Sequence, residues 1–319
     1  MNNQQANVID SSRHRSTSAT SEASEAVITN AMTVDVEDYF HVSAFAKVID
    51  PAHWDRYNWR VEDNTRRLLR LLARHDVRAT FFVLGWVAQR CPALVREIAG
   101  AGHEIACHGL THRLVYEQTP REFREETQTA KMLLEDIVQV AINGYRAASY
   151  SITARSLWAI DILAELGFRY DSSIFPIRHD RYGIPGASRM PYYVQGAHGA
   201  RLLEFPLSTK DFGPVRLPVA GGGYFRLFPY VVTRTALASI NRRERLPFIF
   251  YLHPWEVDPG QPRIAASRLS RFRHYTNLAK CEWRLDQLLG EFRFGTVCDS
   301  LAGLGLWPAA DVRTVSRSA

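Results

Sequence analysis

The sequence predicts an α/β protein built on a parallel sheet or barrel. Strand and helix patterns alternate from residue 27 to about residue 252, as expected when helices connect parallel strands. In addition, several polar residues able to do chemistry stand at or just after the end of a predicted strand. In α/β barrels the functional groups gather at the carboxyl ends of the strands. These residues are Asp35, His108, Arg146, Asp171 and His253.

The first elements are predicted from the spacing of apolar residues. Residues 26–36 read as a buried strand, and residues 61–75 repeat leucine at the spacing of one helical face. Residues 78–84, Arg-Ala-Thr-Phe-Phe-Val-Leu, predict the next strand because β-branched and aromatic residues dominate them. A helix follows and is expected to end near Ala99, directly before two glycines.

The later elements continue the alternation. Residues 103–107 predict a short strand, and apolar residues at helical spacing predict a long helix over residues 120–140. A short strand reaches Arg146, and residues 151–166 read as a helix that Gly167 ends. Extended segments are expected at residues 168–175, 202–207 and the strongly apolar 248–252, with an amphipathic helix at residues 276–289.

Composition narrows the class of protein. The 319 residues are 46% hydrophobic and 23% charged, as in ordinary globular proteins, and no apolar run is long enough for a membrane helix. The net charge of +6 comes without a long basic run, which argues against a nucleic-acid partner. The four cysteines lack paired spacing, and without an expected export signal they indicate a reduced, cytoplasmic protein. They are Cys91, Cys107, Cys281 and Cys298.

Four segments are expected along the chain. Residues 1–26 are rich in Ser, Thr, Asn and Gln without an apolar core, and predict a disordered extension. Residues 27–255 hold the alternating strands and helices of one large domain. Residues 256–307 form a C-terminal extension packed on the barrel, and residues 308–319 a disordered tail.

The strongest chemical signal is a histidine pair, His108 and His112, in the segment His-Gly-Leu-Thr-His. Four residues apart on one helical turn, two imidazoles project to the same side and can share a metal ion. A carboxylate from the acidic segment at residues 35–38 adds a third ligand and leaves a position for water. Two nitrogens and one oxygen suit Zn²⁺ or a similar ion. The alternative is a chance pair in a chain with 11 histidines.

Five motifs together resemble those of the polysaccharide deacetylases of carbohydrate esterase family 4, the NodB-homology proteins, over residues 30–255. They are Asp-Val-Glu-Asp at 35–38, His-Gly-Leu-Thr-His at 108–112, Arg-Ala-Ala-Ser-Tyr at 146–150, Tyr-Asp-Ser-Ser at 170–173 and Leu-His-Pro at 252–254. The stretches 35–41, 251–256 and 273–277 also resemble the deacetylases encoded in exosortase-associated exopolysaccharide clusters. This second resemblance covers about residues 29–297.

The resemblance implies a fold, an activity and partners. The fold is a deformed (β/α) barrel of the NodB-homology type with a C-terminal helical extension, and residues 27–255 are the deacetylase domain. The activity is metal-dependent removal of N-acetyl groups from amino sugars of an exopolysaccharide or its precursor. The implied partners are an N-acetylated glycan and the exopolysaccharide assembly machinery. The sequence leaves the oligomeric state open.

The resemblance also implies roles for particular residues. One divalent ion, zinc or else cobalt, nickel or manganese, is bound by Glu37, His108 and His112, polarises the acetyl carbonyl and activates a water. Asp35 takes the proton of that water, and His253 protonates the departing amine. Arg146 holds Asp35 ionised and oriented. Asp171 orients or tunes one of these groups.

Two departures from the family pattern bear on these roles. The commonest pattern has adjacent aspartates, whereas the acids here stand at positions 35, 37 and 38. Branches similar to allantoinases and certain peptidoglycan deacetylases use acids two apart, which fits Asp35 and Glu37, since residues two apart in a strand share a face. Asp38 stays an alternative ligand if the strand ends early. The arginine motif has Ala148 in place of its usual proline.

Two other functions remain open, an allantoinase-like amidohydrolase on a small cyclic amide and a catalytically silent glycan-binding protein. Aromatic side chains could stack on sugar faces or simply pack in the core. The candidates are Trp54, Trp59, Tyr150 and Trp255. Residues 221–226, Gly-Gly-Gly-Tyr-Phe-Arg, predict a tight loop whose aromatics border the cleft, with a purely structural turn as the rival.

Overall fold

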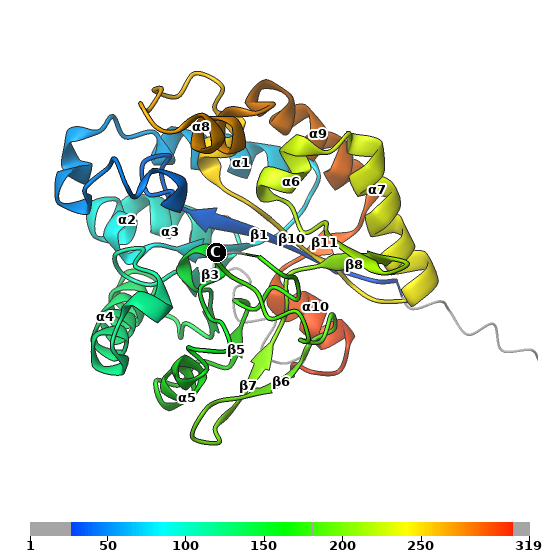
Figure 1. The fold of residues 1–319 in the computed structure, drawn as a ribbon, viewed down its shortest axis with the longest axis horizontal. Coiled ribbons are helices and arrows are strands. Elements are labelled where there is room, and N and C mark those ends of the chain that lie inside the picture. Colours follow the sequence, from blue (N-terminus) through cyan, green and yellow to red (C-terminus); the bar gives the residue numbers. More distant parts are fainter. Residues whose placement is uncertain (1–26, 180, 309–319) are drawn as a thin grey trace, which may run out of the picture.

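The computed structural model describes residues 27–179 and 181–308, and its centre is a curled sheet (Figure 1). The strand order is β10-β1-β2-β3-β4-β5-β7-β6, and β11 also pairs with β1. Every pair is parallel except β6 with β7. The strands are β1 (Asn30–Val36), β2 (Thr80–Val83), β3 (Glu104–Cys107), β4 (Gly144–Tyr145), β5 (Tyr170–Asp171), β6 (Tyr192–Gln195), β7 (Arg201–Glu204), β10 (Ile249–Leu252) and β11 (Phe294–Gly295). The predicted α/β fold with a deformed barrel is confirmed as a curled half-barrel.

Helices cover the outside of the curl, and a small hairpin lies apart from the main sheet. In Figure 1 helices α2 to α5 follow one side of the sheet, while α1, α9 and α7 follow the other. The hairpin is β8 (Thr209–Phe212) with β9 (Val215–Pro218). The helices are α1 (Val61–Arg74), α2 (Gly85–Arg90), α3 (Pro92–Gly100), α4 (Pro120–Val138), α5 (Trp158–Glu165), α6 (Gly222–Leu227), α7 (Tyr230–Ser239), α8 (Arg268–Tyr275), α9 (Leu278–Glu291) and α10 (Val297–Gly303).

Strand β1 carries the site because its two faces have different environments. Met32 and Val34 pack in the large apolar core between sheet and helices. Ala31, one position earlier, belongs to a second core inside the curl. The period of two therefore turns Thr33 and Asp35 inward, although all seven residues of β1 are buried. An ionisable side chain at the inner end of a fully buried strand needs specific partners.

The C-terminal segment completes the barrel as well as covering it. Strand β11 pairs with β1, and Val297 and Leu301 of α10 join the inner core of the curl. Helix α9 turns Leu285 and Leu288 into the outer core, as its apolar spacing predicts. The predicted disordered segments at residues 1–26 and 309–319 lie outside the described residues.

Several element predictions are wrong in detail, for identifiable reasons. The single helix expected to end near Ala99 is two helices, because Pro92 lacks an N–H and starts a new helix. The helix expected from Ser151 begins at Trp158. Before it, the Ser156 hydroxyl accepts from the Thr153 N–H and donates to the Ser151 carbonyl, which closes a local turn instead. Elements β6, β8, β9, β11, α6, α7, α8 and α10 were not predicted.

Candidate metal and catalytic site

The three acids at the end of β1, Asp35, Glu37 and Asp38, have different partners. Asp35 and Glu37 are each 2% exposed, and both lie near the ring of His253. Asp38 is also buried, but its Oδ2 accepts the backbone N–H groups of Arg60 and Val61, at 2.7 and 2.9 Å. These amides begin helix α1, so the Asp38 carboxylate satisfies a helix N-terminus and is turned away from the histidine pair.

The histidine pair lies on a loop, which corrects the expected helical turn. His108 directly follows β3, and the chain then bends through Gly109, with φ of 76°, to His112, with φ of 56°. The carbonyls of Gly109 and Leu110 accept the first two N–H groups of α2, both at 2.8 Å. Because these carbonyls serve another helix's N-terminus, the segment does not form a helix of its own. The imidazole centroids are nevertheless only 5.4 Å apart.

Glu37, His108 and His112 form a group that fits a metal ion. One ligand atom from each lies within 4.8 Å of the others. Oε2 of Glu37 is 2.7 Å from Nε2 of His112, yet no donor among the described residues is aligned for a hydrogen bond to it. Two ligand atoms this close without a hydrogen bond are what a shared cation satisfies.

The protonation of this group also suits a cation. Burial alone disfavours charge on Glu37, but the neighbouring His112, His253 and His108 hold the pKa of Glu37 well below its usual range. Burial lowers the pKa of His108 to about 4, so its ring is neutral near pH 7. His108 Nδ1 lies 2.8 Å from the Arg146 carbonyl, which accepts a hydrogen bond from it. The other ring nitrogen, Nε2, is then the one that can bind a metal ion.

Arg146 is fully buried and reaches Asp35. Its Nη1 donates to Asp35 Oδ1 at 2.7 Å and to the Thr33 hydroxyl at 2.8 Å. Its Nε and Nη2 donate to the carbonyl and hydroxyl of Ser172, and its guanidinium lies 4.0 Å from the centroid of the Phe82 ring. A buried guanidinium with all edges occupied has one orientation, and it fixes the Asp35 carboxylate with it.

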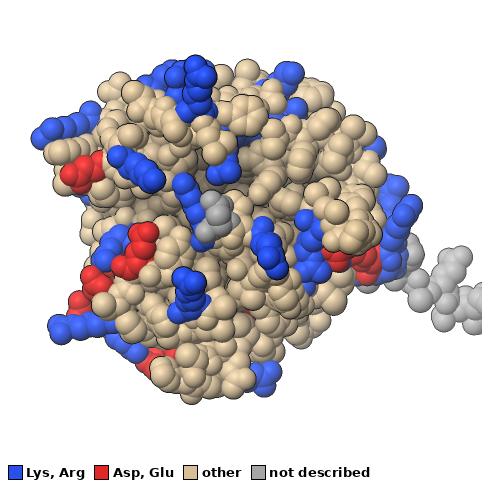
Figure 2. Space-filling view, in the orientation of Figure 1, with Lys and Arg blue, Asp and Glu red and all other residues tan. Residues whose placement is uncertain are grey.

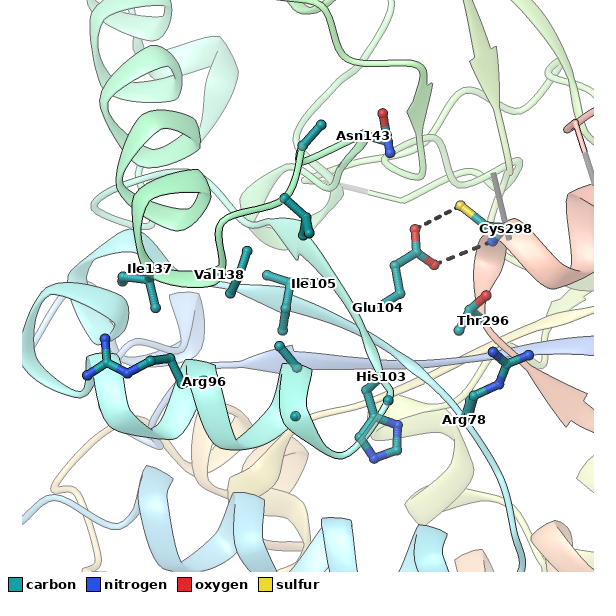
Figure 3. A pocket seen from close by; sticks show the side chains of 15 residues that line it. Arg78, Arg96, His103, Glu104, Ile105, Ile137, Val138, Asn143, Thr296 and Cys298 are labelled. Carbon is teal, nitrogen blue, oxygen red and sulfur yellow. Dashed lines mark hydrogen bonds between the residues drawn. The ribbon is translucent and has the colours of Figure 1, made fainter. Parts of the chain in front are cut away.

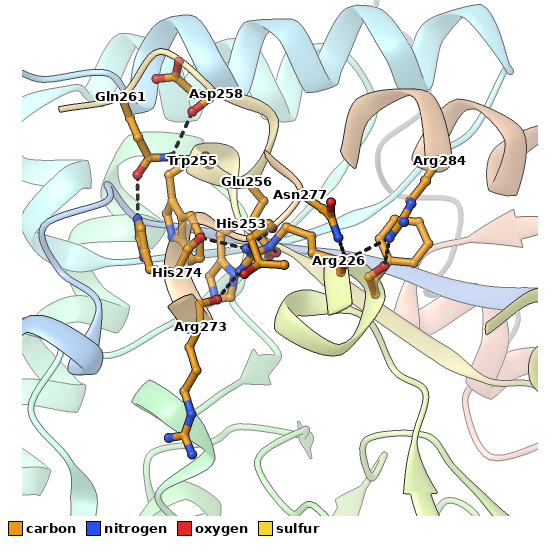
Figure 4. Close-up of polar contacts among 12 residues, drawn as sticks. Arg226, His253, Trp255, Glu256, Asp258, Gln261, Arg273, His274, Asn277 and Arg284 are labelled. Atoms are coloured by element: carbon orange, nitrogen blue, oxygen red, sulfur yellow. Dashed lines mark hydrogen bonds and ion pairs between the residues drawn. The ribbon is translucent and has the colours of Figure 1, made fainter. Parts of the chain in front are cut away.

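His253 is held from behind by an acid that the sequence analysis did not identify. Its Nδ1 lies 2.8 Å from Oε1 of Glu256 (Figure 4). Its Nε2 faces Glu37 Oε1 at 3.6 Å and Asp35 Oδ2 at 3.9 Å. Burial opposes protonation of His253, but the hydrogen bond to Glu256 and the surrounding carboxylates outweigh it and raise its pKa to about 9. The ring is therefore a cation near neutral pH.

Glu256 is in turn paired with Arg226, at 2.5 Å from Nε to Oε2. Burial opposes the charge of Glu256, but Arg226 and His253 lower its pKa to about 2. Arg226 also donates to the carbonyls of His274, Thr276 and Arg273, where helix α8 ends. The spacing of Glu256 three residues after His253, with Pro254 between, was the available signal, since it is that of a capping box.

Asp171 lies one layer behind the site. Its Oδ1 accepts from the Ser173 hydroxyl at 2.5 Å, and that hydroxyl accepts the N–H of Ala147 at 2.8 Å. Asp171 also shares a buried position with Glu204, and burial raises the pKa of both carboxyls. Asp171 thus supports the loop that carries Arg146, without contacting the histidine pair.

Most of the proposed stacking aromatics are packed in the core. Trp54 is 5% exposed and stands edge-on to His41 and Trp86. Trp255 is sandwiched between His253 and His274, with centroid distances of 5.0 and 4.2 Å, and its Nε1 points to Glu37. Tyr150 is buried, and Trp59 stacks on Trp86. These rings shape the walls of the site rather than offering open faces.

A cavity of about 650 Å³ lies at the opposite, amino ends of the strands (Figure 3). Its central acid, Glu104, starts β3 and accepts from the side chains of Thr80, Tyr170 and Cys298. The carboxylate is thus occupied by the fold itself. None of the predicted site residues lines this cavity.

Two family models match two consecutive parts of the chain. Residues 53–170 match the family described as polysaccharide deacetylase, and residues 172–302 match a domain of unknown function, DUF3473. The first match holds the histidine pair and Arg146, and the second holds His253, Glu256 and helix α8. Residues 53–170 are therefore similar to the polysaccharide deacetylase family, and the curled sheet joins them to the segment of unknown function in one site.

Curated relatives agree with this family. The chain is 34% identical over 100 residues to a chitooligosaccharide deacetylase of Bradyrhizobium sp., a match to 31% of this chain and 43% of that protein. It is 26% identical over 146 residues to a peptidoglycan deacetylase of Helicobacter pylori, over 46% of this chain and 45% of that protein. The chain thus spans about half or less of the length of these relatives.

Solved structures support the fold. A candidate polysaccharide deacetylase from Mycobacterium smegmatis aligns over 91% of this chain and 94% of its own, with a TM-score of 0.55 and 22% identity. The Puue allantoinase aligns over 87% of this chain and 89% of its own, with a TM-score of 0.55 and 14% identity. At such identities the likeness concerns the fold alone. None of the described helices is long and apolar enough to cross a bilayer.

Proposed function

We propose that the chain is a metal-dependent hydrolase that removes N-acetyl groups from amino sugars of an exopolysaccharide or its precursor. The observation that carries the proposal is the meeting of a candidate metal group with an acid and a cationic histidine. Glu37, His108 and His112 form the group, and Asp35 and His253 approach it from the neighbouring strands β1 and β10. The matched deacetylase family and its relatives support the substrate class.

Glu37, His108 and His112 would hold the ion. A divalent ion bound there supplies a Lewis acid for the amide carbonyl and lowers the pKa of a coordinated water. Two imidazoles and one carboxylate favour zinc, with cobalt, nickel and manganese as alternatives. Nδ1 of His108 is already committed to the Arg146 carbonyl, so its ligand atom is Nε2.

Asp35 and His253 would move the protons. Asp35 accepts a proton from the attacking water, and its position is fixed by Arg146 at 2.7 Å. His253 presents Nε2 toward the carboxylates and donates its proton to the leaving nitrogen. Glu256 accepts from Nδ1 and stabilises the cationic ring that must make this donation.

A second candidate function is hydrolysis of a small cyclic amide. It is favoured by the acids two residues apart and by the shared fold of an allantoinase. Both candidates use the same groups, and they differ in the substrate that fits. The silent glycan-binding alternative gains no support, because each acid and histidine of the proposed mechanism is present and partnered.

A substrate panel separates these functions. We expect acetate release from N-acetylglucosamine oligomers by the zinc-loaded protein and no hydrolysis of allantoin under the same conditions. The measurement is an enzymatic acetate assay beside a ureide assay. Hydrolysis of allantoin without acetate release would favour the amidohydrolase, and glycan binding without either reaction would favour the silent binding protein.

Two isosteric changes test which acid binds the ion. Replacing a residue that only hydrogen-bonds a metal ligand typically weakens metal affinity by about 10- to 100-fold. Glu37 is proposed to be a ligand itself, so Glu37→Gln is expected to weaken zinc affinity by more than this. Asp38→Asn is expected to keep zinc affinity but to destabilise the fold by about 0.5–2 kcal/mol, because it weakens the cap of helix α1. Competition with a chelator and thermal unfolding measure the two effects. Zinc loss in Asp38→Asn alone would overturn the assignment of Glu37.

We further propose that the reaction takes place in the cytoplasm. The described cysteines are all free thiols, and three are buried. Free thiols persist where glutathione and thioredoxin keep proteins reduced. The mild positive charge and the absence of a basic run in the sequence leave nucleic acid out of the proposed partners.

A further inference from the structure

A second cavity, of about 370 Å³, opens beside His253 and has no role in the chemistry described above. It is bounded by helices α6 and α8, strand β10 and residues 179, 181 and 182. Its volume lies within the range of small-molecule sites. The lining residues used below are Arg181, Tyr182, Tyr224, Tyr251, Phe272 and Arg273.

The cavity adjoins the reaction site through Tyr251. This residue precedes His253 by two positions in the same strand direction, so both side chains turn inward, and their rings are 5.7 Å apart. Two glycines at the start of helix α6 leave room for Tyr251. A Cβ at Gly221 would come 2.0 Å from the Tyr251 carbonyl oxygen, and one at Gly222 would come 2.4 Å from the Tyr251 hydroxyl. The tight loop predicted at residues 221–226 is wrong, because residues 222–227 form helix α6, and Tyr224 of that helix lines the cavity.

The charged side chains among the described lining residues of the cavity are all positive. Arg181 and Arg273 are exposed and line it, and none of its described lining residues is acidic. Figure 2 shows Lys and Arg side chains over the middle of this face, with the visible acidic side chains nearer its left and right margins. Such a cleft raises the local concentration of anions.

Arg273 is positioned by the catalytic framework. Its backbone carbonyl accepts from Nη2 of Arg226, the residue that pairs with Glu256 behind His253. Figure 4 shows the Arg273 side chain extending away from this buried cluster. The same buried guanidinium therefore holds both the general-acid histidine and the helix end that carries Arg273, so the distance between the two is fixed by the fold.

We propose that this cavity binds a carboxylate or phosphate on the sugar next to the one deacetylated, so that the substrate is an anionic glycan. The inference rests on the proposed deacetylase function. Tyrosine rings and hydroxyls suit the faces and hydroxyls of a sugar, and the two guanidiniums supply charge-assisted hydrogen bonds to its acidic group. A neutral glycan offers the two guanidiniums no charged partner.

The test compares substrates that differ in charge. They are chitohexaose, a hexasaccharide alternating N-acetylglucosamine with glucuronate, and a hexasaccharide alternating N-acetylglucosamine with glucosamine 6-phosphate, which carries the charge as phosphate. We expect kcat/KM for an anionic substrate to exceed that for chitohexaose by about tenfold or more, as expected for hydrogen bonds to a charged group. The ratio should fall as ionic strength rises. Which anionic substrate leads tells carboxylate from phosphate.

Variants tie the preference to the cavity. Arg273→Gln and Arg181→Gln are each expected to reduce the anionic-to-neutral ratio severalfold, whereas Arg268→Gln, on the same helix but outside the cavity, should leave it unchanged. Equal rates on charged and neutral substrates in the parent protein, or equal ratios in Arg273→Gln and Arg268→Gln, would overturn the proposal.

The outcome is separable from that of the proposed function. Calorimetric titration of the Asp35→Asn protein with the charged and the neutral hexasaccharide measures the preference without turnover. If no substrate releases acetate, the deacetylase proposal fails, and tighter binding of the charged hexasaccharide would still support the anionic site. If acetate is released without regard to charge and the two titrations agree, only the anionic site is lost.

Discussion

Replacing Asp35 with asparagine is expected to lower kcat by about two to four orders of magnitude while zinc content stays that of the parent protein, because a positioned general base contributes about 10²–10⁴ to the rate. Asparagine keeps the shape of the side chain but cannot accept the proton of the attacking water. The proposed metal ligands are Glu37, His108 and His112, so metal analysis should not change. Acetate release and elemental analysis on the same preparation measure both effects.

The change also removes a negative charge beside a buried cation, and this needs its own control. Arg146 donates to Asp35 at 2.7 Å and is fully buried, so the variant leaves its charge less compensated and should lower the unfolding temperature. Activity is therefore expressed per folded molecule, with folding followed by circular dichroism. Loss of zinc in the folded variant would show that Asp35 is a ligand, and full activity would remove it from the mechanism.

The parts of the site that could be predicted from sequence are those held by strand geometry. Asp35 follows a mainly apolar run in a strand whose seven residues are all buried, and the period of two turns it to the inner face. Glu37, one residue beyond the end of β1, lies on the same face as Asp35. His108 and His253 each directly follow a buried strand, β3 and β10, so their placement at one edge of the sheet needed only the alternation of strands and helices.

The sorting of Glu37 from Asp38 needed the structure. Both are acids after the same strand, and what separates them is a helix start 22 residues later. Asp38 Oδ2 accepts from Arg60 N, a pairing across that interval of the sequence. The prediction of a helical turn at the histidine pair was wrong for a similar reason. The carbonyls of this segment are taken by the N-terminus of α2, which no local pattern around His112 reveals.

Glu256 and Arg226 were missed because their roles depend on contacts far apart in the chain. Arg226 lies 30 residues before its carboxylate partner and donates to carbonyls 47 to 50 residues after it. In sequence it is an ordinary basic residue after three glycines and two aromatics. Only burial, with 1% of Arg226 exposed, distinguishes it from a solvated surface arginine. The segment of unknown function thus supplies the electrostatic support of His253, the proposed general acid.

Replacing His253 with alanine is expected to lower kcat/KM by about two to four orders of magnitude and to remove the basic limb of its pH profile, because the leaving amine then lacks its acid. In the parent protein the pKa of His253 is raised to about 9. A general acid must be protonated, so kcat/KM should fall as the pH rises through that value. Zinc content should not change, since the ligand group does not include His253.

The variant Glu256→Gln separates protonation of His253 from its mere presence. It keeps the ring but removes the negative charge and weakens the hydrogen bond to Nδ1, 2.8 Å away, so the pKa of His253 should drop. The basic limb should then begin at lower pH, with a smaller loss of rate than in His253→Ala. Glu37 and Asp35, the other acids beside the ring, are the same in both proteins, so the displacement reports Glu256. His75→Gln, on the outer surface at the end of α1, is the control and should leave the profile unchanged. A basic limb that stays in place in both His253→Ala and Glu256→Gln would mean that His253 orients the site and another group delivers the proton.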